Sequence, residues 1–379
     1  KKAEIGQDFD AYSLSLNTFG ASEVQYDKNV AIDETSAFRL NAYFNTFENH
    51  RDYSDGSGYG VNPTYKFALS DQTTLDVSVE AIDYDRSIDR GIPSINGTPV
   101  DRLDGIVFGD EDLNKSEFEL LAFRALLQHS FSDTLKGIFS ASYTDYDKLY
   151  QNWYAKNYDG NDTIEFDGYV DTTKRQNLVL SGNLVAEFEQ GDVNHTVLFG
   201  AEFLQSSSEN DRYTPDFDPT AAVDSTIDLG IAARNTAGTG FNAGGLVVPF
   251  NAVKDDSTSD VDVFSLYVQD EIELSDNLTA LLGARYDKYE IDSVNKKPGS
   301  SFNKKSDDSA SEVPPRMGLI YKPQEDVSVY ASYSQTFLPA SGDQFATVGG
   351  GADFDPNEYT NLEAGVKLNL AAGFNVTAA

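Results

Sequence analysis

The sequence has 379 residues, 62 acidic and 28 basic, and this net charge of -34 excludes nucleic acid as a partner, because phosphate binding needs a basic face. It contains no cysteine, which rules out disulfides and thiolate metal sites. No run approaches the roughly 18 apolar residues of a membrane-spanning helix, so a helical membrane protein is excluded. A transmembrane β-barrel stays compatible, since its strands expose only alternate residues to lipid.

Apolar and polar residues alternate with a period of two along most of the chain. In LYVQDEIELS (266–275), for example, only Asp270 interrupts the alternation. This period predicts β-strands, because successive side chains of a strand point to opposite sides. About fifteen strands are predicted, near residues 10–19, 22–32, 36–47, 59–69, 74–86, 116–131, 134–148, 174–189, 193–205, 261–274, 278–290, 312–322, 327–338, 358–370 and from 374.

The predicted strands are long, and their connections alternate in length. A tilted strand needs roughly 9–11 residues to cross a bilayer, whereas strands of soluble domains have a mode of about 5–6. From the third strand onward, long connections alternate with short ones at 70–73, 132–133, 190–192, 275–277, 323–326 and 371–373. Short periplasmic turns and long extracellular loops are typical of outer-membrane barrels. We therefore predict an all-β, transmembrane, antiparallel up-and-down β-barrel.

Two alternatives and one consequence accompany this fold prediction. A soluble β-sandwich or adhesin would stay in solution without detergent, and a passive porin-type channel would share the barrel. Fifteen strands that did not close would leave backbone groups bare in lipid, and bacterial single-chain barrels have even strand numbers. We therefore expect residues 1–379 to form one partial barrel domain of a chain that continues at both ends.

Three segments resemble the ferric-siderophore group of the TonB-dependent outer-membrane receptors. FSLYVQDEIELSDNLTALLGARYDKYE (264–290) is similar to a hairpin of that group, and EVPPRMGLIYKPQEDVSVYASYSQTFLP (312–339) resembles its next segment. NEYTNLEAGVKLNL (357–370) resembles a later strand, and RGIPSINGTPV (90–100) resembles part of a loop. Together these segments span most of residues 90–370.

The resemblance implies a transporter in the outer membrane of a Gram-negative bacterium, and not an enzyme. Barrels of this kind have about 22 strands and a plugged lumen, so the plug and the last strands would lie outside this sequence. The implied partners are a ferric siderophore, the TonB-ExbB-ExbD complex, and membrane lipid with lipopolysaccharide, around a monomer. Iron is expected only as part of the cargo, with no resident cofactor. A vitamin or a carbohydrate is the alternative substrate.

Charged residues of both signs fall on the face that the alternation turns inward. Mixed charges in a lumen must be wet or paired. They are consistent either with a water-filled pore or with a folded plug that meets them through ion pairs. The residues predicted to face the lumen include Arg39, Arg124, Glu202, Arg285, Arg316, Glu363 and Lys367.

Aromatic residues are dense in 147–173, which we expect to be an extracellular loop. Aromatic side chains offer large, stiff contact areas to an organic ligand. The candidate ligand contacts are Tyr150, Trp153, Tyr154 and Tyr158. The alternatives are packing of the loop against itself, or an aromatic belt at the membrane interface.

No catalytic or metal-binding motif is present. His50, His129 and His195 form no His-x-x-x-His pair, and there is no Gly-x-Ser-x-Gly elbow. The longest predicted loop, 206–260, is rich in acidic residues. Its acidity indicates either a saline habitat, which we favour, or a ligand of neutral or positive charge.

Overall fold

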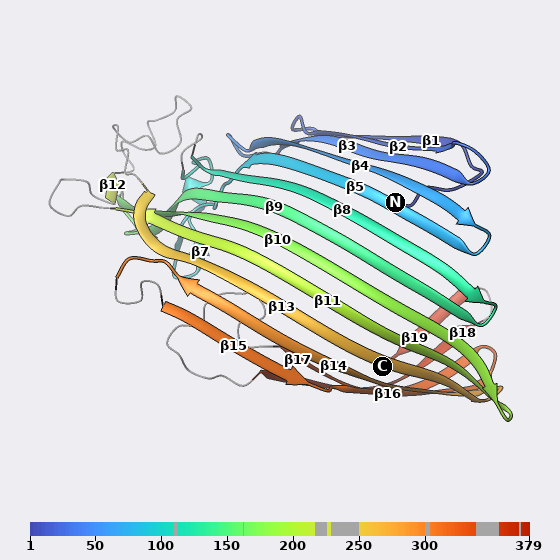
Figure 1. The fold of residues 1–379 in the computed structure, drawn as a ribbon. Coiled ribbons are helices and arrows are strands. Elements are labelled where there is room, and N and C mark those ends of the chain that lie inside the picture. Colours follow the sequence, from blue (N-terminus) through green and yellow to red (C-terminus); the bar gives the residue numbers. More distant parts are fainter. Residues whose placement is uncertain are drawn as a thin grey trace.

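The computed structural model describes residues 1–109, 113–161, 163–216, 226–228, 250–299, 304–338, 356–370 and 373–379. Within these ranges, seventeen strands form one antiparallel sheet (Figure 1). In chain order they are β1 (Phe9–Leu16), β2 (Ser22–Ala31), β3 (Ser36–Glu48), β4 (Asp55–Ser70), β5 (Thr73–Ser87), β8 (Lys115–Ser132), β9 (Leu135–Tyr158), β10 (Thr163–Gln190), β11 (Val193–Pro215), β12 (Thr226–Asp228), β13 (Phe250–Ser275), β14 (Leu278–Asn295), β15 (Lys304–Glu312), β16 (Pro315–Gln324), β17 (Val327–Leu338), β18 (Asn357–Leu370) and β19 (Phe374–Ala378).

A small irregular unit interrupts the sheet between β5 and β8. It holds the hairpin of β6 (Ser94–Ile95) and β7 (Thr98–Pro99), followed by a 3-10 turn over Asp101–Leu103. Among the described residues, no helix is long and apolar enough to cross a membrane.

The wall strands pair with their neighbours in chain order, which is an up-and-down topology. β15 and β16 lie end to end against β14 in one register, with Glu312 opposite Asp287 and Pro315 opposite Ala284. The consecutive prolines Pro314 and Pro315 have no backbone N–H to donate, so they split what is one wall strand. With β15 and β16 counted once and the three-residue β12 left out, the seventeen strands are fifteen wall strands, which confirms the predicted count.

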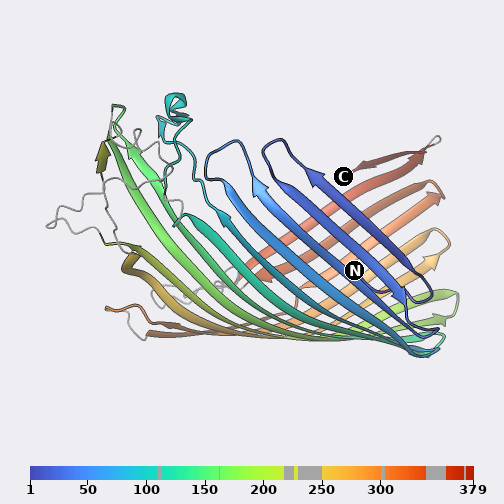
Figure 2. The same ribbon diagram turned by 90° about the horizontal axis from the view of Figure 1, so that it is seen from above.

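The sheet curves strongly, as the view from above in Figure 2 shows. The tight turns that join β4 to β5, β8 to β9 and β10 to β11 lie together at the right-hand end of the wall in Figure 1. The long connections leave from the other end. The predicted short connections therefore lie at one end of the wall, whereas the alternation fails at the other end between β9 and β10, which only residues 159–162 join.

The strand pairing divides the side chains of the wall into two faces. Side chains directly opposite each other on neighbouring antiparallel strands share a face. We call the polar, concave side the inner face and the other side the outer face. One row of opposite residues crosses the inner face from β3 to β14: Arg39, Thr64, Ser78, Arg124, Ser142, Val179, Leu204, Val263 and Tyr289.

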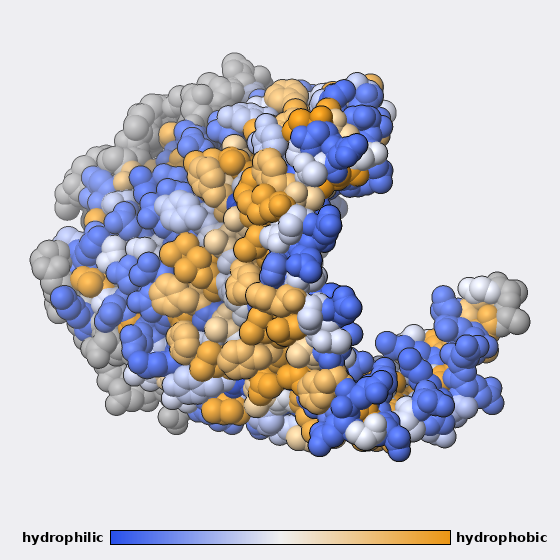
Figure 3. All heavy atoms as spheres, turned by 45° about the vertical axis from the view of Figure 1, so that its right-hand side comes forward, coloured by the Kyte–Doolittle hydropathy of each residue, from blue (hydrophilic) through white to orange (hydrophobic). Residues whose placement is uncertain are grey.

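Large hydrophobic side chains are exposed on the outer face. Figure 3 shows them as a band across the wall, with hydrophilic residues on either side. We call this the apolar band. A continuous exposed apolar band of this kind is typical of a surface that faces the hydrocarbon of a membrane. Its members include Phe123, Phe139, Tyr143, Leu180, Phe199, Phe264, Leu266, Val268, Leu282 and Met317.

Asp270, the one interruption in the alternation of residues 266–275, has a partner on the same face. Its Oδ2 lies 2.8 Å from Nδ1 of His195 on β11. The His195 ring in turn stacks on Phe188, with ring centroids 5.0 Å apart. A polar group on an apolar surface is costly unless it is hydrogen-bonded. His195 provides this bond for Oδ2 of Asp270, whereas Oδ1 is buried without a hydrogen-bond partner.

Four wall strands are far longer than a membrane crossing requires. β9, β10, β11 and β13 contain 24, 28, 23 and 26 residues, against roughly 9–11 for a crossing. The prediction of loops is therefore wrong over 149–158, 163–173, 206–215 and 250–260, which lie in strands. Paired polar and aromatic residues extend these strands past the apolar band, where the apolar alternation ends. Residues 217–225 and 229–249 of the predicted loop 206–260 lie outside the described residues.

Candidate ligand-binding site

The candidate site lies on the extended part of β9 and β10, beyond the apolar band. On the outer face of β9, Phe139 and Tyr143 give way to Asp145 and Asp147, which marks the edge of the band. Residues 150–154 lie further along the same strand.

Three tyrosines form the aromatic part of the site on the inner face. Tyr150 and Tyr169 stack with ring centroids 5.7 Å apart, and Tyr154 meets Tyr169 edge-on at 6.3 Å. The register places them together, because Tyr169 of β10 is directly opposite Asn152 of β9, which lies between Tyr150 and Tyr154. Each of the three rings is partly exposed. The arrangement offers stiff aromatic surface toward the space that the wall encloses.

Arg90 adds a positive charge to these rings. Its guanidinium carbon lies 5.0 Å from the ring centroid of Tyr154 and 5.9 Å from that of Tyr169, within the range of a cation–π interaction. Nη1 donates hydrogen bonds to the Tyr169 hydroxyl at 2.9 Å and to Oδ1 of Asn152 at 3.3 Å. Arg90 itself is exposed. We call Arg90, Tyr150, Tyr154 and Tyr169 the aromatic site.

Arg51 fixes the segment that carries Arg90. It forms an ion pair with the carboxylate of Asp89, the residue before Arg90. It also donates to the carbonyl oxygens of Asp104 at 2.5 Å and Ile106 at 2.9 Å. Oδ1 of Asp89 accepts a hydrogen bond from the backbone N–H of Gly91 at 2.8 Å. Arg51 therefore joins the β3–β4 connection to both ends of the segment 89–106.

Asn114 fixes the other end of the connection between β5 and β8. Its side chain donates to the carbonyl of Ile88 at 3.1 Å and to that of Trp153 at 2.9 Å, and it accepts from the Trp153 N–H at 2.7 Å. β8 begins at Lys115, and β9 continues past this point. Beyond the start of β8, the Asn114 side chain therefore forms with the backbone of Trp153 the hydrogen bonds that a neighbouring strand would form with β9.

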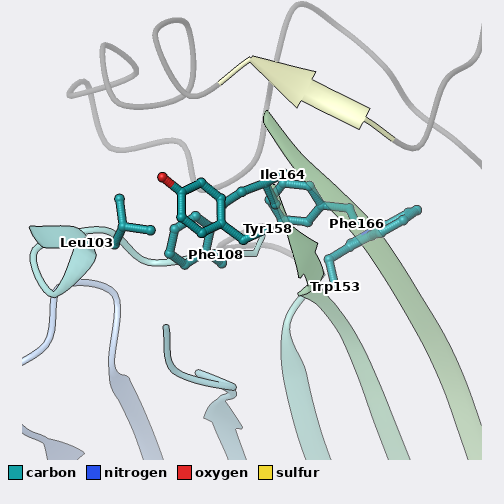
Figure 4. Packing of buried hydrophobic residues seen from close by; sticks show 6 residues of the cluster. All are labelled: Leu103, Phe108, Trp153, Tyr158, Ile164 and Phe166. Atoms are coloured by element: carbon teal, nitrogen blue, oxygen red, sulfur yellow. The ribbon is translucent and has the colours of Figure 1, made fainter. Parts of the chain in front are cut away.

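A hydrophobic cluster covers the side of the β9–β10 hairpin that is opposite the aromatic site. It comprises Leu103, Phe108, Trp153, Tyr158, Ile164 and Phe166, shown in Figure 4, and we call it the cap core. Trp153 and Tyr158 are only 3% and 7% exposed. Trp153 and Tyr158 are two of the four predicted ligand contacts. The loop prediction places them on the surface, but in the structure they are buried in the cap core. Tyr150 and Tyr154 lie in the aromatic site.

Burial raises the pKa of Tyr150 and that of Tyr154 above the ordinary tyrosine value. Both phenols therefore stay protonated at neutral pH, and they can donate as well as accept hydrogen bonds. A hydrogen bond from Arg212 to Asp171 raises the pKa of Arg212, whose guanidinium lies 4.7 Å from the Tyr169 ring centroid. Nε of Arg212 is 2.5 Å from Oδ1 of Asp171.

Aromatic rings paired with arginines continue along the inner face toward β5. Tyr84 stacks on Phe118 at 5.4 Å, and Phe118 meets Tyr146 at 5.8 Å. Arg86 lies 4.5 Å from the Tyr84 ring centroid, and Arg175 lies 5.8 Å from that of Tyr146. The aromatic site is therefore one end of a longer surface of aromatic rings and arginines on the inner face.

Serine side chains occupy the inner face of β11, β13 and β14, in line with the Arg175 end of this aromatic surface. Ser208, Ser259 and Ser293 are directly opposite one another in a row that starts at Arg175. The Oγ atoms of Ser259 and Ser293 are 3.2 Å apart. Beyond the apolar band, the inner face therefore carries aromatic side chains on β5 to β10 and serine hydroxyls on β11, β13 and β14.

The seven charged residues predicted to face the lumen all lie on the inner face of the wall, among the crossing strands. Arg39 pairs with Asp27 and Glu4, each at 2.8 Å, and Arg124 pairs with Glu80 at 2.6 Å. The register places the seven, Arg39, Arg124, Glu202, Arg285, Arg316, Glu363 and Lys367, on this one face.

Two small networks hold most of the others. Arg285 donates to Glu202 at 2.9 Å and to Asp287 at 2.7 Å. Glu363 accepts from the Tyr330 hydroxyl at 2.6 Å, and Lys367 lies over the same ring. Four of the seven, Arg39, Arg124, Glu202 and Arg285, are therefore in ion pairs, while Glu363 and Lys367 contact the neutral Tyr330.

Three members of this surface escaped the sequence-based selection of ligand contacts: Arg90, Tyr169 and Arg212. Two signals in the sequence bear on them, since RGIPSINGTPV begins at Arg90 and Tyr169 lies within the aromatic-rich stretch 147–173. These residues come together because β9 pairs with β10 and because Arg51 holds the segment of Arg90. Neither contact can be predicted from the local sequence. Among the described residues, no group of three or more histidine, aspartate or glutamate side chains is placed to hold a metal ion.

A curved antiparallel wall with an apolar outer face and a polar inner face defines an outer-membrane β-barrel protein. Residues 58–379 match the family model described as TonB dependent receptor-like, beta-barrel. The chain belongs to this family of outer-membrane receptors of Gram-negative bacteria, which are not enzymes.

Individual relatives agree with this assignment. The metal-pseudopaline receptor CntO of Pseudomonas aeruginosa (strain UCBPP-PA14) is 26% identical over 364 residues, which cover 92% of this chain and 47% of that protein. The probable TonB-dependent siderophore receptor PiuA of Acinetobacter baumannii is 25% identical over 359 residues, covering 86% of this chain and 47% of that protein. The chain thus spans about half the length of these relatives.

Solved structures share the fold. The crystal structure of PiuA from Acinetobacter baumannii aligns with a TM-score of 0.84 and 21% identity, over 100% of this chain and 57% of that one. The closed form of the ferric-catecholate import receptor Fiu from K12 E. coli aligns with a TM-score of 0.82 and 17% identity, over 100% and 58%. At this level of identity, the similarity establishes the architecture of the wall.

Proposed function

We propose that the whole protein is a TonB-dependent receptor that takes up ferric-siderophore complexes across the outer membrane. The names of its relatives support this substrate class, since they refer to a metal-pseudopaline receptor, a probable siderophore receptor and a ferric-catecholate import receptor. Iron would pass through as cargo within the chelate, without a resident cofactor.

The aromatic site is the observation that carries the proposal. It lies beyond the apolar band, on the inner face, where a ligand arriving from outside the cell would first meet the wall. Stacked tyrosines offer flat contact area, and their protonated hydroxyls and Arg90 offer hydrogen-bond donors to chelate oxygens. Such a combination of apolar surface with a few placed polar groups is typical of small-molecule sites.

The paired charges lower on the inner face suit a role in transport. A plug folded inside the lumen would exchange hydrogen bonds with groups such as Arg285 and Glu202. In this proposal, the TonB-ExbB-ExbD complex remodels the plug, the receptor acts as a monomer, and lipid and lipopolysaccharide surround its outer face.

Uptake measurements test the proposal directly. Cells with and without the complete gene would receive radiolabelled iron bound to a hydroxamate, a catecholate or citrate. We expect gene-dependent uptake with at least one carrier, abolished when tonB is deleted. Uptake that persists without TonB would indicate a passive channel. No iron phenotype with any carrier would reject the proposal and turn attention to a vitamin or carbohydrate substrate.

A further inference from the structure

Arg90 is a cation that no carboxylate of the described residues neutralises through an ion pair. The hydrogen-bond acceptors that it reaches, the hydroxyls of Tyr150 and Tyr169 and the Asn152 amide, are neutral groups. A guanidinium has five N–H donors, more than these three acceptors occupy. The nearby acids are already engaged, because Asp171 pairs with Arg212 at 2.5 Å and Asp167 with Lys156 at 3.5 Å.

The orientation of Arg90 prepares it to bind an oxyanion. Contact with the Tyr154 and Tyr169 rings holds the guanidinium over their faces, and Arg51 holds the segment that carries Arg90 at the Asp89 side chain and at the Ile106 carbonyl. A guanidinium fixed in this way presents its N–H groups as a planar fork, the geometry that carboxylate and phenolate oxygens fit. Little side-chain freedom remains to be lost on binding.

The sign of this charge is opposite to that of the molecule. The chain has a formal net charge of -34, yet the exposed group of the aromatic site is positive. Charge interactions are screened over about 8 Å at physiological ionic strength. A ligand seated on Tyr169 would therefore respond to Arg90 far more than to the acidic residues elsewhere on the protein.

We propose that Arg90 selects anionic metal chelates, binding their carboxylate or phenolate oxygens while Tyr150, Tyr154 and Tyr169 contact their organic part. This inference rests on the proposed function and narrows its substrate class. It also chooses between the two explanations of the acidic sequence. The acidity reflects the surroundings of the protein, and the ligand is neither neutral nor positive.

The test compares ferric complexes that differ in charge on the intact receptor. Purified protein would be titrated with the ferric complex of 2,3-dihydroxybenzoate, which is anionic, and with that of acetohydroxamate, which is neutral. The variants are Arg90→Gln, which removes the charge, and Arg90→Lys, which keeps it. Arg102→Gln is the matched control, because Arg102 lies in the same connection but stacks over Tyr158 and donates to the Asn161 carbonyl.

We expect the unmodified protein to prefer the anionic complex, and Arg90→Gln to weaken its binding by roughly tenfold or more, the effect of losing a charge-assisted hydrogen bond. Arg90→Lys should recover part of the loss, and Arg102→Gln should bind normally. Preference for the neutral complex, or equal affinity in Arg90→Gln, would overturn the inference and leave ferric-chelate uptake standing. Binding of neither complex together with absent iron uptake in cells would reject the proposed function itself.

Discussion

Two aspartates on neighbouring extended strands show how much a single partner matters. Asp171 on β10 faces inward and pairs with Arg212. Asp211 on β11 lies on the other face, because Thr172 and not Asp171 is directly opposite it. Burial and the nearby carboxylate of Asp256 raise the pKa of Asp211. The same residue type is thus stabilising at one position and destabilising at the other.

Asp211→Asn should stabilise the folded protein at neutral pH by about 0.5 kcal/mol, the scale of a partly exposed charge interaction. Because the pKa of Asp211 is higher in the folded protein than in the unfolded chain, its ionisation favours unfolding. This penalty is complete above the folded pKa and absent below the unfolded value of about 4. Thermal unfolding in detergent at several pH values measures the difference between variant and unmodified protein.

The paired variant Asp171→Asn provides the control for that prediction. It removes the partner of Arg212 and should lower stability at neutral pH. A gain from Asp211→Asn that persists unchanged into acid would contradict the assigned role of ionisation.

Gly200 lies beneath the ring of Tyr267, and a Cβ at this position would overlap the ring. The Tyr267 hydroxyl donates to Oδ1 of Asn183 at 2.7 Å, so the ring bridges across β11 to β10. Gly60 under Tyr43 and Gly365 under Tyr330 repeat the arrangement. Each tyrosine covers a glycine on the neighbouring strand, as in the aromatic rescue of glycines in sheets.

Gly200→Val should destabilise the wall by about 1–3 kcal/mol, because the valine displaces the Tyr267 ring and its hydrogen bond. Loss of secondary structure on heating, followed by circular dichroism in detergent, reports the effect. Ala201→Val, one residue along and on the outer face, serves as the control and should unfold at nearly the unmodified temperature. Similar melting temperatures for the two variants would show that the Tyr267 ring moves aside at little cost.

At the scale of elements, the connection between β5 and β8 is held by few residues and positions the aromatic site. Arg51→Ala should free the segment 89–106, since it removes the ion pair to Asp89 and two hydrogen bonds to backbone carbonyls. We expect faster cleavage of this segment by chymotrypsin and weaker ligand binding, with the wall itself unchanged. A local loss of about 1.5–3 kcal/mol corresponds to a charge-assisted hydrogen bond.

Arg102→Ala is the appropriate comparison for Arg51→Ala, because it removes an arginine of the same connection that makes one backbone hydrogen bond. If both variants were cleaved at the same rate as the unmodified protein, the segment would be held by the cap core alone.

The faces of β13 differ in what they tolerate. Val268 is 46% exposed on the outer face, and Gln269 follows it on the inner face. Val268→Arg should impair assembly by about 2–4 kcal/mol, the cost of a lipid-facing arginine near the bilayer midplane, and Gln269→Arg should be tolerated. The heat-resistant band on unboiled electrophoresis gels quantifies assembled protein. Equal yields for both variants would contradict the division of the wall into faces.

The sequence predicted some elements better than others, for physical reasons. The number of wall strands and the faces of residues such as Leu266 and Arg124 follow from alternation that lipid enforces. Beyond the apolar band this constraint ends, so the extended halves of β9 and β10 looked like loops. The cap core depends on Phe108 and Trp153, which meet only after the chain has folded, and the position of Arg90 depends on Arg51. Local patterns carry no information about such distant contacts.

At the scale of the whole molecule, the net charge of -34 and the positive aromatic site should act on binding in opposite ways. The overall field repels an anionic chelate at long range, so its association should become faster as salt screens that field. The contact with Arg90 is short-ranged, so dissociation should also become faster. Stopped-flow measurements with the ferric 2,3-dihydroxybenzoate complex at several ionic strengths separate the two rates. An association rate that falls steadily with added salt would show that local attraction dominates the approach.

The cap core has a further consequence, because it lies beyond the apolar band and is therefore surrounded by water. Its stability comes from the aversion of water to hydrocarbon, which weakens on cooling and in urea. The outer face of the wall gains nothing of this kind, since lipid chains are as apolar as leucine. The outward end that carries the aromatic site should therefore loosen under mild denaturant or in the cold while the membrane-embedded part stays intact, as if a water-soluble domain had been fused to a membrane anchor.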